Sequence, residues 1–132
     1  MKTIIIVAAA AFLSACSARP FEQTSTIYDS KYLLENPILT QVRVHRIKQL
    51  SGSALGEDCP LVVKVDNEEI AGLQQNQYID LYLPSGKHTI SIRFKCALTA
   101  WRRSVELNAD GDYQEYSAES GSAGQYSMQR IK

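Results

Sequence analysis

The chain has 132 residues, with 14 Lys and Arg against 14 Asp and Glu and a formal net charge of zero at pH 7. This length suits a single domain of ordinary size. The balanced charge argues against nucleic acid binding, which selects basic surfaces, and against binding to anionic lipid head groups through bulk charge.

The first 15 residues have the pattern of an export signal. Met1-Lys2 gives a positive start, and Ile4 to Leu13 is an unbroken apolar run that ends in small residues. A transmembrane helix needs roughly 20 apolar residues, so this run is too short for a permanent span. We therefore expect residues 1–15 to be a signal peptide.

The sequence Leu13-Ser14-Ala15-Cys16 resembles the lipobox of bacterial lipoproteins. The resemblance implies that Cys16 becomes the acylated first residue of the mature protein, with palmitate-type chains that contribute about 0.8 kcal/mol per buried CH₂. Ser17 resembles the residue that sends such lipoproteins to the outer membrane, which places the domain in the periplasm. The alternative is an ordinary secretory signal with a cysteine at its end by chance.

Residues 16–37 are expected to form the lipidated cysteine and a polar tether. Within the tether, Ile27-Tyr28 and the stretch Tyr32 to Leu34 are more apolar, and they fit a short strand or helical turn lying on the domain. Pro37 disfavours helix at the residue before it. Residues 38–132 are expected to form the folded domain.

From residue 38 onward the apolar residues alternate as in β-strands, and no long stripe has helical spacing. The turn signals include Asp66-Asn67, Pro84-Ser85-Gly86 and Asp110-Gly111. We expect an all-β fold, an antiparallel β-sandwich of seven to eight strands. The expected strands are Leu39–Lys48 with a possible bulge near Arg46, Leu61–Val65, Ile70–Leu73, Tyr78–Leu83, His88–Phe94, Ser104–Leu107, Tyr113–Ala118 and Tyr126–Ile131.

The stretch from Val65 to Ile90 resembles PEGA-type β-sandwich modules and an uncharacterised family of small bacterial lipoproteins. In that pattern a strand ends in Asp-Gly or Asp-Asn, a short strand with a glycine follows, and the next strand ends in Leu-x-Pro-Gly-x-His. This chain has Asn67 where glycine is usual and Ser85 inserted between proline and glycine. The resemblance implies an envelope accessory module and carries over no catalytic residue.

Cys59 and Cys96 remain if Cys16 is acylated, and two cysteines in an exported domain indicate one disulfide. The alternative is a pair of buried free thiols. The only two histidines, His45 and His88, lack the close spacing of zinc ligands, so we expect no metal. We expect both histidines at exposed strand positions.

The sequence contains no complete motif for catalysis or cofactor binding. The segment Gly86-Lys87-His88 lacks the upstream glycine and the following Ser or Thr of a phosphate loop. The polar residues from Asn108 to Asp112 lack the glycine of a calcium loop and indicate a hairpin turn instead. We therefore expect a protein that is not an enzyme and has no cofactor.

Trp101, Arg102 and Arg103 are the candidate partner-binding residues, because Trp and Arg are enriched in binding hot spots. The alternative is that Trp101 caps the core while the arginines face water. The seven tyrosines suit sheet faces as well as a binding surface.

The expected function is that of a membrane-anchored envelope lipoprotein acting as a non-catalytic interaction or scaffold module. Its expected partners are the membrane, through the acyl chains on Cys16, and an envelope protein contacting the sheet edges or the Trp101 loop. One alternative is the lipoprotein subunit of an envelope-spanning secretion machine. Another is a ligand-binding or enzyme-inhibiting lipoprotein of the immunity type.

Overall fold

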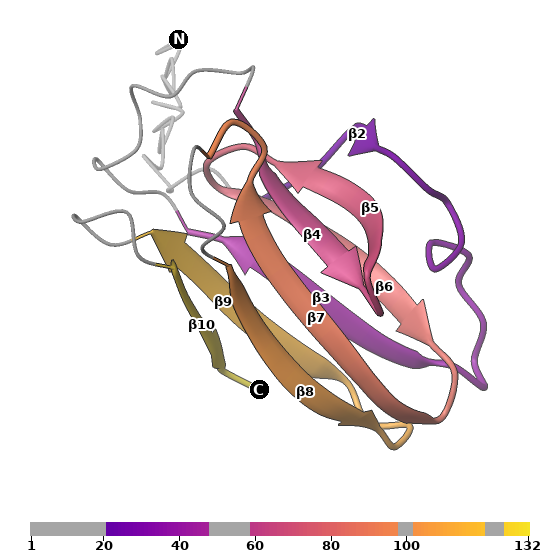
Figure 1. Cartoon of the computed structure of the whole chain (residues 1–132). Helices are drawn as coiled ribbons and strands as arrows, with labels where there is room; N and C mark the ends of the chain where they lie inside the picture. Colours follow the sequence, from indigo (N-terminus) through magenta and orange to yellow (C-terminus); the bar gives the residue numbers. More distant parts are fainter. Residues whose placement is uncertain (1–20, 48–58, 98–101, 121–125) are drawn as a thin grey trace, which may run out of the picture.

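Figure 1 shows the computed structural model of the chain, which describes residues 21–47, 59–97, 102–120 and 126–132. In these ranges there are ten strands and no helix, arranged as two five-stranded sheets packed face to face. The predicted all-β sandwich is confirmed. The strands are β1 (Glu22–Gln23), β2 (Thr26–Ile27), β3 (Thr40–Arg46), β4 (Leu61–Val65), β5 (Glu68–Leu73), β6 (Gln77–Leu83), β7 (Gly86–Phe94), β8 (Arg103–Ala109), β9 (Gln114–Ser120) and β10 (Tyr126–Arg130).

The two sheets differ in strand direction. Sheet I has the order β1-β6-β3-β9-β10, and its β1–β6 and β3–β9 pairs are parallel. Sheet II has the order β2-β5-β4-β7-β8 and is antiparallel throughout. The antiparallel arrangement expected from tight turns is therefore complete in sheet II and partial in sheet I.

The core lies between the sheets and is built by the inward residues of each strand. Alternation puts every second side chain on one face, which is why β3, β6 and β7 each contribute two or more fully buried residues. The largest fully buried apolar side chains are Leu61, Ile70, Leu73, Ile79, Leu81, Leu83, Ile90, Ile92, Val42, Val44 and Val63.

The predicted bulge near Arg46 is wrong, because the pairing of β3 with β9 runs in regular register from Val42 to Arg46. His45 and Arg46 are both buried for a different reason. Arg46 points inward, donating to the carbonyl of Leu73 at 2.9 Å. His45 points outward and is covered by Phe21. The register shift lies instead between β4 and β5.

The strand count exceeds the predicted seven to eight because of the segment before residue 30. β1 pairs with β6 in sheet I, and β2 pairs with β5 in sheet II. Between them, the Thr24 amide donates to the Tyr78 carbonyl at 2.9 Å, and the Thr24 hydroxyl donates to the Gly72 carbonyl. Residues 22–27 of the expected tether thus form a strap that joins the two sheets along one side.

Two of the three predicted turns connect a strand of one sheet to a strand of the other sheet. The Pro84–Gly86 turn takes the chain from β6 in sheet I to β7 in sheet II, and Gly86 has a φ of 125°. The Asp110–Gly111 turn takes it from β8 back to β9 in sheet I, so the expected hairpin there is wrong. The Asp66-Asn67 turn is a true hairpin, with both residues at positive φ. Among the described residues, no helix has the length and hydropathy needed to cross a bilayer.

Candidate functional site

The outer face of sheet I gathers aromatic side chains around one arginine. Tyr78 and Tyr82 project from β6, Arg43 from β3, Tyr113 lies just before β9, and Phe21 lies just before β1. We call these five residues the tyrosine face. All five keep part of their surface exposed, up to 47% for Phe21. Aromatic residues and arginine are the types enriched at protein interfaces.

Arg43 occupies the centre of the tyrosine face and is fixed by two neighbours on β6. Its Nε and Nη2 atoms donate to the two carboxylate oxygens of Asp80 at 2.7 and 3.0 Å. The guanidinium carbon lies 4.0 Å from the centre of the Tyr78 ring. The hydrogen bonds to Asp80 raise the pKa of Arg43 above its ordinary value. Because the guanidinium is stacked on a ring and hydrogen-bonded along one edge, its remaining surface is held in one orientation toward a binding partner.

The Tyr113 side chain is oriented by a carboxylate on the adjoining strand. Its hydroxyl donates to Glu115 Oε1 at 2.7 Å. Burial, and then the hydrogen bond to Glu115, raise the pKa of Tyr113 well above its ordinary value. Tyr113 therefore offers its ring and a hydroxyl oxygen, which can accept a hydrogen bond from a partner.

Phe21 extends the tyrosine face by packing on His45. The two ring centres are 3.5 Å apart, and His45 is only 3% exposed. The prediction that His45 is exposed is therefore wrong, because a strand position on the outer face is covered by the segment that leads into β1. Burial lowers the pKa of His45, which favours the neutral ring.

His88 is also buried, contrary to the prediction, at the end of the sandwich where β6 turns into β7. Its Nδ1 lies 2.7 Å from Asp66 Oδ2, and its Nε2 lies 2.7 Å from the carbonyl oxygen of Pro84. Both neighbours can accept a hydrogen bond from a ring N–H. The histidine therefore ties the β4–β5 hairpin turn to the β6–β7 turn, which is a structural role.

The residues singled out from the sequence are not brought together by the fold. Cys16 and Trp101 lie outside the described residues. Arg102, just before β8, and Arg103, its first residue, are both exposed, but they lie on opposite faces of sheet II, since Arg103 pairs with the inward-facing Ile92. The predicted disulfide is present, with the Cα atoms of Cys59 and Cys96 5.2 Å apart.

Sequence reasoning missed the tyrosine face because its parts are far apart along the chain. Arg43 and Asp80 are 37 residues apart, and they meet only through the register of β3 against β6. The available signal was the outward alternation of Tyr78, Asp80 and Tyr82 within one strand.

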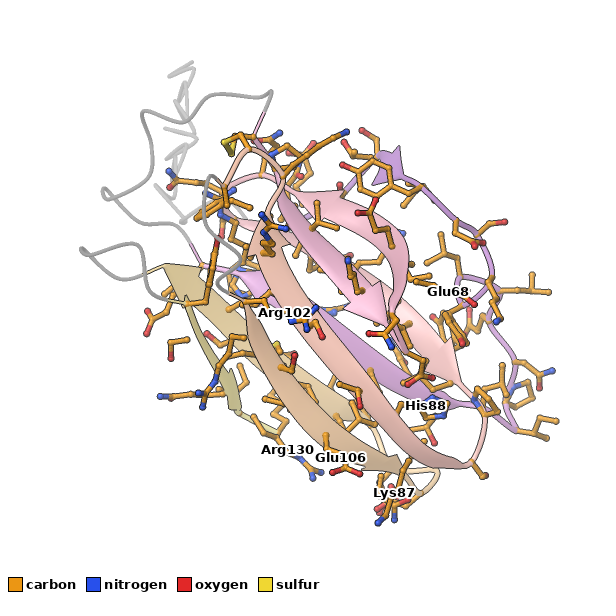
Figure 2. All side chains as sticks on the ribbon, viewed as in Figure 1. Glu68, Lys87, His88, Arg102, Glu106 and Arg130 are labelled. Carbon is orange, nitrogen blue, oxygen red and sulfur yellow. A yellow bond between two sulfur atoms is a disulfide. The ribbon has the colours of Figure 1, made fainter. Side chains whose placement is uncertain are left out.

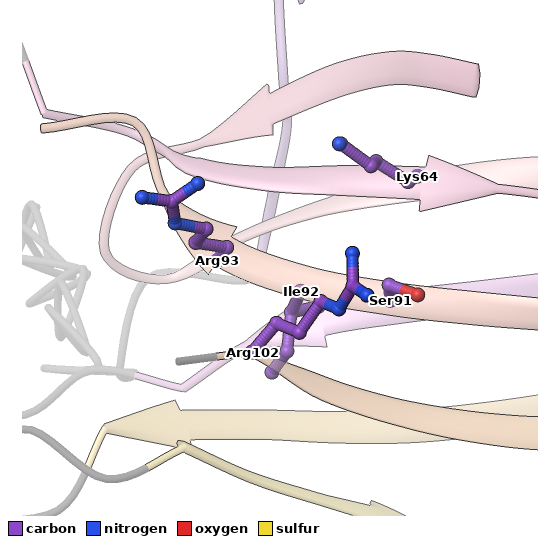
Figure 3. A pocket seen from close by; sticks show the side chains of 5 residues that line it. All are labelled: Lys64, Ser91, Ile92, Arg93 and Arg102. Carbon is purple, nitrogen blue, oxygen red and sulfur yellow. The ribbon is translucent and has the colours of Figure 1, made fainter. Parts of the chain in front are cut away.

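Arg102 does take part in a second feature, on the outer face of sheet II. A shallow pocket of about 170 Å³ lies there, lined by Lys64, Ser91, Ile92, Arg93 and Arg102 (Figure 3). No group of three or more potential metal ligands of the His, Cys, Asp and Glu types occurs among the described residues.

No protein-family model matches the chain, and comparison with the curated proteins gives no significant match.

Proposed function

We propose that this protein is an envelope lipoprotein that binds another envelope protein through the tyrosine face. The observation that carries the proposal is the fixed cluster of Arg43, Tyr78 and Tyr113 on the outer face of sheet I. Ordered aromatic and arginine side chains lose little entropy on binding, and they are the residues that contribute most to interfaces. The anchoring part of the proposal rests on the lipobox at Leu13 to Cys16.

The strap gives the anchor a mechanical consequence. Only six residue steps join Cys16 to Glu22, the first residue of β1, and an extended chain covers about 20 Å in that many steps. If Cys16 carries the acyl chains, the sandwich stays beside the bilayer instead of extending far from it. Holding the domain in this layer raises its effective concentration near membrane-bound partners.

Acylation is tested by growing cells with an alkyne analogue of palmitate and purifying the protein. We expect label on the natural chain and none on Cys16→Ala. The double variant Cys59→Ala/Cys96→Ala is the matched control, because it removes two cysteines and keeps Cys16. Label that persists in Cys16→Ala, or that is missing from the natural chain, contradicts the anchor.

Partner binding is tested by affinity purification from detergent-solubilised envelopes, with Tyr113→Ala and Tyr78→Ala compared against Tyr28→Ala. Tyr28 is a matched control, because it is 36% exposed against 37% for Tyr113 and lies beside β2, on the sheet II side. We expect one stoichiometric partner with the natural chain and with Tyr28→Ala. Its loss should be at least about tenfold in the two face variants, as for a hot-spot residue.

The identity of the partner distinguishes between the alternative forms of the proposed function. An inner-membrane protein indicates a subunit of an envelope-spanning machine, and a secreted hydrolase indicates an inhibitor. Equal capture by all three variants contradicts the assignment of the tyrosine face as the contact surface.

A further inference from the structure

The outer face of sheet II carries three cations on neighbouring strands. Lys64 comes from β4, Arg93 from β7, and Arg102 from the residue before β8 (Figure 3). Together with Ser91 and Ile92, these three residues line the pocket of about 170 Å³. We call this the cation pocket. Three positively charged side chains beside a hydroxyl group are suited to binding an oxyanion.

Ser91, which lines the cation pocket, and its neighbour Ser104 can together supply one further hydrogen bond. Ser91 Oγ and Ser104 Oγ lie 2.8 Å apart, facing each other across β7 and β8. Two hydroxyls carry two hydrogens, and the bond between them uses one. The second hydrogen is free to point at a ligand oxygen, beside the ammonium of Lys64 and the planar guanidinium of Arg102.

No carboxylate among the described residues forms an ion pair with Lys64 or Arg102. The ion pairs among the described residues are Lys31–Glu68, Arg43–Asp80 and His88–Asp66. Neither Lys64 nor Arg102 belongs to one of these pairs. The nearest acids by register are Glu69, opposite Lys64 on β5, and Glu106, two residues along β8 from Ser104. Figure 2 shows Glu106 farther along β8 than Arg102, toward the opposite end of the sandwich.

Arg93 is oriented rather than freely mobile. Its Nη2 donates to the carbonyl of Ala97 at 3.0 Å, and this bond fixes the side chain beside the strand end that leads to the disulfide. An arginine positioned in this way loses little further conformational freedom when a ligand arrives.

We propose that the cation pocket binds a phosphate group, through Lys64, Arg93, Arg102 and the Ser91–Ser104 hydroxyl pair. A tetrahedral anion suits a site that combines a compact ammonium, planar guanidinium donors and a hydroxyl donor. Two sources share this chemistry, a phospholipid head group and a soluble phosphate compound. The lipid source rests on the proposed anchoring, and it is consistent with the position of the pocket.

The position of the pocket follows from the strand register. Arg93 pairs with Val62 near the start of β4, and Leu61 pairs with both Phe94 and Leu73. The chain enters β1 at this same end, where the amide of Glu22 donates to the carbonyl of Asn76 at 3.1 Å. The entry of the N-terminal segment and the cation pocket therefore share one end of the sandwich.

The first experiment is a titration of the mature protein in uncharged detergent micelles with inorganic phosphate, followed by ¹⁵N NMR. Chloride at equal ionic strength is the reference. We expect saturable shifts of the Ser91 and Ser104 amides with phosphate alone. Lys64→Gln and Arg102→Gln should each weaken binding about tenfold, as expected for a charge-assisted hydrogen bond.

Lys87→Gln is the matched control, because it removes one exposed cation from the opposite end of β7 (Figure 2). It should bind phosphate like the natural chain, and Lys64→Arg should keep most of the affinity. Shifts that do not saturate, or an equal loss in Lys87→Gln, overturn the pocket. The titration needs no acyl chain, so it decides the pocket even if the labelling of Cys16 fails.

A second arm identifies the source of the phosphate. The lipidated protein is placed in phosphatidylcholine nanodiscs with or without phosphatidylglycerol. Shifts of the same two amides that need phosphatidylglycerol, and that are lost in Lys64→Gln, support a lipid head group. Phosphate binding in micelles without a response in nanodiscs assigns the pocket to a soluble phosphate compound and overturns the lipid source.

Discussion

The link between Asp66 and His88 shows how two single residues organise one end of the sandwich. Asp66 lies at a φ of 49°, which leaves its carboxylate beside β7. There it accepts hydrogen bonds from the Thr89 amide at 2.9 Å and from His88 at 2.7 Å. Burial alone would raise the pKa of Asp66, but the hydrogen bonds from Thr89 and His88 outweigh it and lower the pKa below its usual range.

Asp66→Asn is therefore expected to destabilise the protein in a pH-dependent way. Asparagine tolerates the same positive φ, so the change isolates the charge. A carboxylate with a lowered pKa contributes stability above its unfolded pKa of about 3.9, and that stability is lost as the pH falls through the folded pKa. The side chain is 41% exposed, so screening keeps the expected loss at pH 7 to about 1 kcal/mol.

Urea unfolding at pH 7, 5 and 3 measures this effect for the natural chain and for Asp66→Asn. The difference in unfolding free energy should be largest at pH 7 and should shrink at pH 3. Asp112→Asn, at an exposed position in the β8–β9 turn, should show little difference at any pH. A constant difference across the three values would mean that the charge of Asp66 is not what stabilises the turn.

Among the elements, the strap formed by β1, Thr24 and β2 links the two sheets within six residues. β1 and β2 belong to different sheets, so the strap closes one side of the sandwich. Thr24 is 5% exposed and hydrogen-bonds to β5 and β6. Gly72 also lets Tyr28 and Pro60 pack close to β5, because a Cβ there would meet the hydroxyl of Tyr28 at 2.9 Å and Pro60 at 3.0 Å.

Thr24→Val is expected to lower the unfolding free energy by about 1 to 2 kcal/mol. Valine has nearly the same shape, but it removes the hydroxyl that donates to the Gly72 carbonyl and accepts from the Thr26 amide, which leaves buried polar groups without that partner. Thr26→Val, the same change inside β2, should cost much less, since a β-branched residue suits a strand. Chemical denaturation of both variants checks this, and equal losses would argue against the strap as a specific link.

Long strands are easier to predict from the sequence than short ones. The eight longer strands are predictable because each has apolar residues recurring over four or more positions, and the period of two residues is clearest from Tyr78 to Leu83. β1 and β2 have two residues each, which cannot show a period. Turn chemistry located the bends at Gly86 and Gly111, but the same turn residues serve hairpins and connections between sheets.

The candidate surfaces were less predictable than the strands, because they depend on register between distant segments. Ser91 meets Ser104 across β7 and β8, and Lys64 reaches the same pocket from β4. Arg102 was selected for its residue type, and it does line that pocket, but separately from Arg103. Composition identifies residues suited to binding, whereas only the fold decides which of them share a face.

At the scale of the whole molecule, the disulfide joins the ends of two adjacent central strands of sheet II. Cys59 precedes β4 and Cys96 follows β7, and the Lys95 amide donates to the Pro60 carbonyl at 3.0 Å just inside the bridge. The backbone pairing of β4 with β7 runs from Leu61 to Val65 inside the bridge. A disulfide of this kind is expected to stabilise the protein mainly by restricting the unfolded chain.

The double variant Cys59→Ala/Cys96→Ala is expected to lose about 4 kcal/mol of unfolding free energy at most, given a sequence separation of 37 residues. Guanidinium unfolding should show a lower midpoint and a larger m-value, because the unbridged chain exposes more surface when unfolded. Reductant should move the natural chain to the midpoint of the variant and leave the variant unchanged. An unchanged midpoint in both tests would contradict a stabilising role for the bridge. The stability of the sandwich would then come from its apolar core and from the strap.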